Sequence, residues 1–128
     1  MSKSLILVVL VSIIFIGCSS KLNCYREKLI GMWYADSIIT PTELDFDDHS
    51  IWFKPNGTCR LPWTTSDGIV LFQSYELSEI KGKVYITISG EQALSGKYLL
   101  ECKCEFKKSI DTLFLKSNLT RLEFYKLD

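Results

Sequence analysis

The residue types that most often carry catalysis are sparse in this chain of 128 residues. Its single histidine, His49, stands beside Asp47 and Asp48, just before an apolar stretch. A serine nucleophile would need that histidine within hydrogen-bonding reach, and the chain has no Gly-x-Ser-x-Gly motif to present one. A histidine at such a loop position is more typical of a solvated side chain than of a base. The sequence therefore predicts a protein that is not an enzyme and uses no cofactor.

A group of carboxylates precedes the same apolar stretch and consists of Glu43, Asp45, Asp47 and Asp48. Carboxylate oxygens are good calcium ligands, but this segment lacks the glycine-turned loop with a closing glutamate that EF-hand sites use. A solvated acidic loop is the favoured interpretation, and no metal site is expected.

Cys102 and Cys104 flank Lys103 in a segment where apolar and charged residues alternate. Residues at i and i+2 of one strand face the same way with Cα atoms about 6.6 Å apart, the far limit for a disulfide. Each is therefore expected to pair with Cys24 or Cys59, and both connectivities of this kind stay open. A zinc site built from the four thiolates is the rival, but zinc ligands usually come from Cys-x-x-Cys turns rather than from strands.

The first residues have the layout of a secretion signal. Lys3 precedes an apolar run from Leu5 to Ile16 that only Ser12 interrupts, and small residues follow it. As a helix the run rises about 18 Å, which is short for a hydrocarbon core of about 30 Å, so an uncleaved spanning anchor is the less favoured alternative. Export to an oxidising compartment is also what favours disulfides among the later cysteines.

The end of this run, Phe15-Ile16-Gly17-Cys18, resembles the bacterial lipobox. The resemblance implies that residues 1–17 are a lipoprotein signal peptide, that Cys18 carries fatty acyl chains such as palmitate, and that residues 18–24 form a lipidated tether. Phe15 replaces the usual leucine, so ordinary cleavage nearby stays as an alternative. The implied location is the bacterial cell envelope, where the lipid anchors the protein to a membrane. The outer membrane is favoured, with the protein facing the periplasm.

The rest of the chain is enough for one small domain, residues 25–128. Lysine and arginine number 15, and so do aspartate and glutamate, with no basic block. We therefore expect no nucleic-acid partner, and we expect a monomer.

After a short helical turn between Cys24 and Ile30, apolar residues recur with period two, the pattern of half-buried strands. The predicted strands are residues 32–39, 50–54, 58–64, 69–77, 83–89, 97–107, 112–116 and 121–127. Short turns between several of them favour antiparallel neighbours and hence a meander. Closing the meander into a barrel removes its edges, although a two-sheet sandwich satisfies the same alternation.

Leu29-Ile30-Gly31-Met32-Trp33, followed by Ile51-Trp52-Phe53-Lys54-Pro55-Asn56-Gly57-Thr58, resembles the small lipocalin-like lipoproteins of bacteria. Tyr75, Tyr98 and the final strand, residues 122–127, also fit that family. The resemblance implies an all-β, eight-stranded antiparallel up-and-down barrel with Trp33 packed at its closed end. The full lipocalin pattern adds a Thr-Asp-Tyr turn, which this chain lacks, and a late arginine covering the tryptophan, for which Arg121 is the candidate.

Alternation places a set of large side chains inside the barrel, with Trp33 near one end. The set is Tyr34, Ile51, Phe53, Leu71, Tyr75, Val84, Ile86, Tyr98 and Leu100. They fill most of an eight-strand interior, so we expect at most a shallow apolar pocket at the open end. The candidate pocket or core residues are Trp33, Tyr34, Phe53, Tyr75, Tyr98 and Leu100.

Two functions fit these features. The favoured one is a lipid-anchored, non-catalytic binding protein of the cell envelope that holds a small hydrophobic ligand at the barrel mouth. The alternative is a protein interaction module, or an inhibitor of an envelope-acting enzyme, with Trp52 and Trp63 as exposed anchors.

Overall fold

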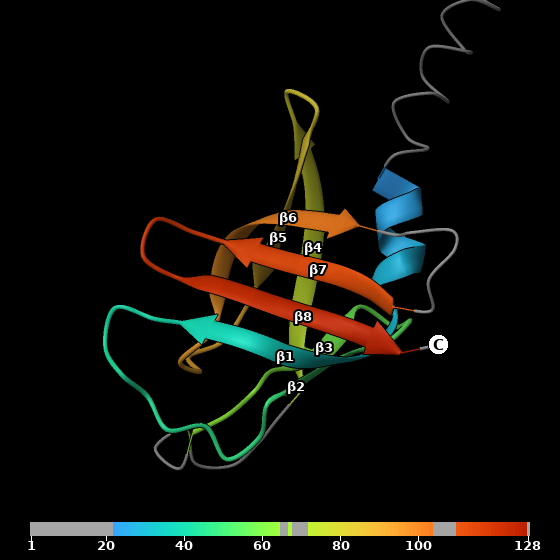
Figure 1. The fold of residues 1–128 in the computed structure, drawn as a ribbon. Coiled ribbons are helices and arrows are strands. Elements are labelled where there is room, and N and C mark those ends of the chain that lie inside the picture. The colour runs from blue at the N-terminus through green and yellow to red at the C-terminus, as the bar shows by residue number, and fades with distance from the viewer. Residues whose placement is uncertain (1–21, 65–66, 68–71, 104–109, 128) are drawn as a thin grey trace, which may run out of the picture.

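The computed structural model describes residues 22–64, 67, 72–103 and 110–127. The described chain forms eight antiparallel strands that close into a barrel in chain order (Figure 1). The strands are β1 (Gly31–Ile39), β2 (Ser50–Phe53), β3 (Thr58–Arg60), β4 (Gln73–Ile80), β5 (Lys83–Ile88), β6 (Gly96–Lys103), β7 (Ile110–Lys116) and β8 (Arg121–Leu127). The predicted meander barrel is confirmed, and its closure decides against the sandwich. The signal segment, Cys18, Leu71 and Cys104 lie outside the described residues.

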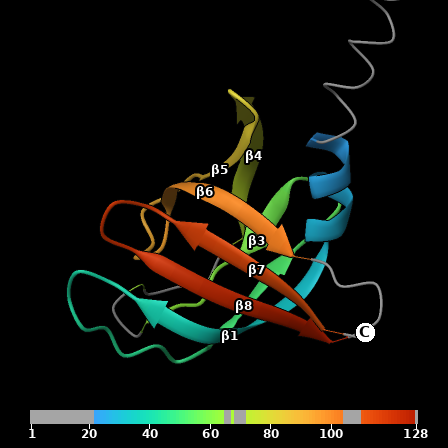
Figure 2. The same cartoon turned by 45° about the horizontal axis from the view of Figure 1, so that its top comes forward.

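A helix over residues 22–29 precedes β1 and lies at the end of the barrel where β1 begins and β8 finishes (Figures 1 and 2). Leu22, Tyr25 and Leu29 recur at helical spacing, which puts them on one face. Leu29 is buried, and Leu22 and Tyr25 pack against the barrel core. The helix therefore covers this end of the barrel. Among the described residues, no helix combines the length and the apolar character that a membrane crossing requires.

The barrel interior is filled by buried apolar side chains drawn from almost every strand. Those with no exposed surface are Trp33, Ile51, Phe53, Cys59, Leu61, Ile86, Leu94, Leu113, Leu115, Leu122 and Phe124. Tyr98 is buried with them, and its hydroxyl donates a hydrogen bond of 2.7 Å to the carbonyl of Leu94. Burying polar groups costs little when they are bonded in this way. The core is thus packed with side chains rather than hollow.

The third strand is shorter than predicted. β3 ends at Arg60, although alternation suggested a strand to residue 64. Leu61 and the buried Pro62 follow, and proline has no N–H to donate to a neighbouring strand. Within the described chain, β3 pairs with β4 through Thr58 with Ser74 and Cys59 with Gln73.

β1 contains a bulge, and its side chains alternate in one phase before the bulge and in the other phase after it. Trp33 is fully buried, whereas Tyr34 is 43% exposed and packs on Tyr125 outside the barrel. The pairing of β1 with β8 then shifts between Ala35 and Ser37, the signature of an extra residue in one strand. The prediction that Tyr34 points inward is wrong, because Trp33 takes the inward place in this pair of adjacent aromatic residues.

Beyond the bulge the alternation is reversed. Ile38 packs against the core, and Ile39 is 55% exposed. Without the extra residue at Asp36, a strict period of two from Trp33 would have turned Ile39 inward and Ile38 outward.

Candidate functional site at the barrel mouth

The barrel opens where β1 and β2 separate. The two strands pair from Gly31 with Phe53 to Tyr34 with Ser50, and the Ala35 N–H then donates to the carbonyl of His49 at 2.7 Å. Further along, β1 continues to Ile39 with β8 as its sheet neighbour. This mouth lies at the opposite end of the barrel from the helix (Figure 1).

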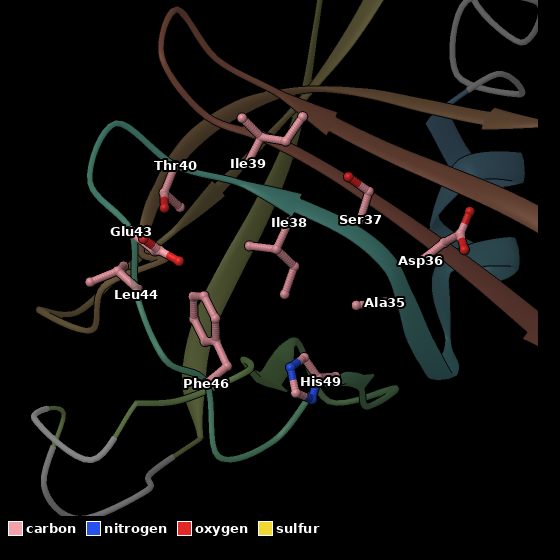
Figure 3. A pocket seen from close by; sticks show the side chains of 10 residues that line it. All are labelled: Ala35, Asp36, Ser37, Ile38, Ile39, Thr40, Glu43, Leu44, Phe46 and His49. Atoms are coloured by element: carbon pink, nitrogen blue, oxygen red, sulfur yellow. The ribbon is translucent and has the colours of Figure 1, made fainter.

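A pocket of about 470 Å³ occupies the mouth. It is lined by Ala35, Asp36, Ser37, Ile38, Ile39, Thr40, Glu43, Leu44, Phe46 and His49. Ile38 points from β1 towards Phe46 on the loop, while Ser37 and Ile39 extend to the other side of the strand (Figure 3). Ala35, Ile38 and Phe46 also pack against the barrel core, so the apolar floor of the pocket continues into the interior.

The loop that forms the second wall is held in place by the chain on its far side. Phe46 makes an isolated bridge with Thr64, and the Asp47 N–H donates to the carbonyl of Trp63 at 2.8 Å. Asp48 accepts hydrogen bonds of 2.7 Å from both the N–H and the hydroxyl of Ser50. These contacts fix the position of the second wall of the pocket relative to β2 and the chain that follows β3.

The charged groups at the mouth are mainly acidic. Asp36 and Glu43 line the pocket, and Asp45 and Asp47 lie on the same loop. The lining residues include no lysine or arginine. The pocket therefore combines an apolar floor with lining carboxylates, and Arg121 lies opposite Ile39 on the neighbouring strand β8.

Most of the residues predicted to form either the pocket or the core belong to the core. Trp33, Phe53, Tyr98 and Leu100 are core residues and do not line the mouth pocket. Tyr75 packs at the rim of the core, where burial and the nearby Cys59 raise the pKa of its hydroxyl. That hydroxyl donates to the carbonyl of Lys54 at 3.2 Å.

Tyr75 lines a different groove from the mouth. This groove runs between the helix and β4, and its other lining residues are Arg26, Glu27, Ile30, Pro55, Gly57, Glu76 and Leu77. The structure therefore does not bring Tyr75 together with the residues of the mouth.

Ile38, Phe46 and His49 were not predicted to be neighbours. The available signal was Phe46, a lone aromatic residue within the acidic group, because an apolar side chain among carboxylates needs somewhere to pack.

Among the described residues, the disulfides expected of Cys24 and Cys59 are not formed. Cys24 is exposed on the helix and Cys59 is buried inside β3, and both are free thiols. Their surroundings explain the difference, because one thiol faces solvent and the other lies in the packed core. Burial raises the pKa of Cys59 to about 12, which keeps it protonated and unreactive. Within the part of the chain that the structure describes, no three His, Cys, Asp or Glu side chains gather into a metal site.

Trp33 marks the end of the barrel opposite the mouth. Its indole N–H donates to the carbonyl of Leu29 at 2.9 Å, which ties the last turn of the helix to β1. Lys126 lies over its ring, with Nζ 5.4 Å from the ring centroid. The same Nζ donates a hydrogen bond of 2.6 Å to the carbonyl of Ile30. Gly31 makes room for it, since a Cβ there would lie 2.9 Å from that nitrogen.

The expectation that Arg121 covers the tryptophan is wrong. Arg121 pairs with Ile39 at the mouth end of β8, while Lys126 lies near the other end of the same strand. A single lysine late in β8 therefore provides the cation.

The outer face of β2 and β3 carries a second feature, the aromatic–cation cluster of Trp52, Lys54, Arg60, Trp63 and Phe72. The Arg60 guanidinium lies 5.2 Å from the Trp63 ring and 5.8 Å from the Trp52 ring. Lys54 Nζ lies 3.9 Å from the Phe72 ring, which is 40% exposed. Rings and cations thus alternate across this face.

Comparisons with known protein families, with curated proteins and with solved structures find no match.

Proposed function

We propose that this protein is a lipid-anchored, non-catalytic binding protein of the bacterial cell envelope whose ligand site is the barrel mouth. The observation that carries the proposal is the contrast between a filled interior and an open mouth. Core side chains with no exposed surface occupy the barrel, whereas a pocket of about 470 Å³ lies between β1 and the following loop. Pockets for small ligands commonly have volumes of about 300 to 1,000 Å³ and mix an apolar lining with a few polar groups.

The anchor is proposed from the sequence, since Cys18 precedes the first described residue. A lipid on Cys18 would be followed almost at once by the helix at residues 22–29. That helix packs at the end of the barrel opposite the mouth, so the mouth of a tethered protein would face away from the membrane. Replacing Cys18 with serine should then release the protein from membrane fractions. Continued attachment of the variant would indicate an uncleaved helix instead.

The binding site is tested with two isoleucines, one in the pocket and one outside it. Ile38→Ala removes apolar surface from the pocket floor, whereas Ile80→Ala removes an exposed side chain of β4 that does not line the pocket. Loss of the floor contact should weaken binding of an uncharged apolar fluorescent probe about tenfold, the equivalent of about 1.4 kcal/mol. The Ile80 variant should bind as the wild type does, and equal behaviour of the two variants would contradict a site at the mouth.

A second candidate function rests on the aromatic–cation cluster. Tryptophan, tyrosine and arginine are the residue types that dominate protein–protein binding, and here two tryptophans flank Arg60 on the outer face. This arrangement favours a protein interaction module, or an inhibitor of an envelope-acting enzyme. Inhibition of envelope-degrading hydrolases by the purified protein, lost in Trp63→Ala and kept in Leu119→Ala, would support it. No inhibition by the wild type would contradict it.

A further inference from the structure

β1 presents a strand edge at the mouth. Asp36 to Ile39 have β8 on one side, and on the other side β2 pairs with β1 only as far as Tyr34. Among the described residues, the last backbone bond towards the loop is that from Ala35 to His49. An edge of this kind offers its N–H and C=O groups to another extended chain.

The pocket lies directly alongside this edge. Its far wall is the loop of Glu43, Leu44 and Phe46, and the pocket lies between this loop and β1 (Figure 3). An added strand would run about 4.8 Å from β1, with alternate side chains facing opposite sides. The inward side chain opposite Ile38 would meet the apolar floor of Ile38 and Phe46.

We infer that the mouth takes an extended, positively charged peptide segment, which adds to the β1 edge and inserts one apolar side chain between Ile38 and Phe46. The inference rests on the proposed function, because it assumes that the mouth is the binding site. Backbone hydrogen bonds supply affinity in such strand addition, and alternate pockets supply specificity.

The charge of the peptide follows from the rim. Asp36 and Glu43 line the pocket, and Asp45 and Asp47 stand on the same loop. Lysine or arginine on either side of the inserted residue would therefore meet carboxylates, and an acidic peptide would be repelled. The occupant is thus a segment of a partner that alternates basic and apolar residues.

The test uses the full-length chain in detergent and a fluorescein-labelled peptide of sequence Thr-Lys-Leu-Lys-Thr. We expect saturable binding that displaces the uncharged apolar probe and slows amide exchange in residues 36–40. A peptide with the same side chains but N-methylated backbone nitrogens should bind at least about tenfold more weakly, since it cannot pair with a strand edge. Equal binding of the methylated peptide would overturn strand addition.

Two further comparisons test the charge. Replacing both lysines of the peptide with glutamate should abolish binding, and Glu43→Gln should weaken binding of the original peptide. The matched control is Glu91→Gln, which removes an exposed carboxylate that does not line the pocket. If the glutamate peptide binds equally well, the inferred charge of the partner is wrong.

The outcomes also separate this inference from the function on which it rests. Probe binding that depends on Ile38 without peptide binding would overturn the inference and leave a small-ligand site at the mouth. Failure of both probe and peptide to bind would overturn the proposed function as well.

Discussion

Cys59 lies in the barrel interior, and burial raises the pKa of its thiol from 9.0 to about 12. Burial likewise raises the pKa of Tyr98 from 10.0 to about 12. Both groups are neutral when protonated, so the folded protein holds their protons at a pH where the unfolded chain releases them. Their contribution to stability is therefore fully present below about pH 9 and is lost as the pH rises towards 12.

The first prediction follows from this loss of stability with rising pH. Between pH 9 and 12 the free energy of unfolding should fall by about 1 kcal/mol per pH unit on account of Cys59 alone, with Tyr98 adding to the slope above pH 10. Urea unfolding at several alkaline pH values measures the slope. Cys59→Ala should flatten it, and Cys24→Ala, which changes an exposed thiol, should not. An unchanged slope in Cys59→Ala would mean that the thiol is accessible to water.

The packed interior gives a second prediction. Leu100 is 2% exposed and faces Val84 and Leu115 on the two neighbouring strands. Leu100→Ala should lower the free energy of unfolding by about 2 to 5 kcal/mol, because the void is only partly filled by relaxation. Leu119→Ala, at a position 70% exposed, should change it by less than about 0.5 kcal/mol. A small effect at Leu100 in denaturant unfolding would indicate a hollow barrel.

Period-two alternation was a good guide to single residues inside regular strands. Ile51, Phe53, Val84, Ile86, Tyr98 and Leu100 were all predicted to face inward, and all are buried. The orientation of Tyr34 was not predictable in this way. Trp33 and Tyr34 are adjacent large aromatic residues, so the alternation fits with either of them facing inward. The mouth was not predictable either. Ile38 reaches it only because of a bulge, and Phe46 and His49 are positioned by tertiary contacts of a loop.

At the scale of elements, the helix and β1 are joined by one buried hydrogen bond, from the Trp33 indole to the carbonyl of Leu29. Trp33→Phe keeps an aromatic ring but leaves that carbonyl without its donor. We expect a loss of about 1 to 3 kcal/mol in the free energy of unfolding. Amide exchange should also become faster across residues 22–29. Trp63→Phe, a change of a partly exposed ring on the outer face, is the control and should leave exchange in the helix unchanged.

Element boundaries were predicted less well than element order. The eight strands and their antiparallel succession followed from short turns and alternation, since a parallel pair would need a long crossover. β3 ends early because of Pro62, and this proline could have been used to predict the boundary from the sequence. The bulge in β1 had no such signal, because an extra residue is defined by the pairing partner rather than by the bulged strand.

At the scale of the whole molecule, the barrel has two different ends. The helix and the Lys126–Trp33 pair lie at one end, and the acidic mouth lies at the other. The sequence predicted a barrel without showing which loops surround its mouth, since the ends of distant strands meet only after closure. The acidic pocket lining was not predictable from the net charge either, because acidic and basic residues are equal in number over the whole chain.

This arrangement has a mechanical consequence. β1 starts beside the helix, whereas β8 starts at the mouth, so a chain held at the helix and pulled at Leu119, just before β8, is loaded in opposite directions along these two strands. The bonds between β1 and β8, from Tyr34 with Tyr125 to Ile39 with Arg121, then share the force in shear. Pulling instead on the helix and on the last residues of β8, which lie at the same end of the barrel, opens β1 from β8 one bond at a time (Figure 1). We expect a clearly higher rupture force in single-molecule pulling for the first geometry than for the second, and similar forces would contradict a load path along β1.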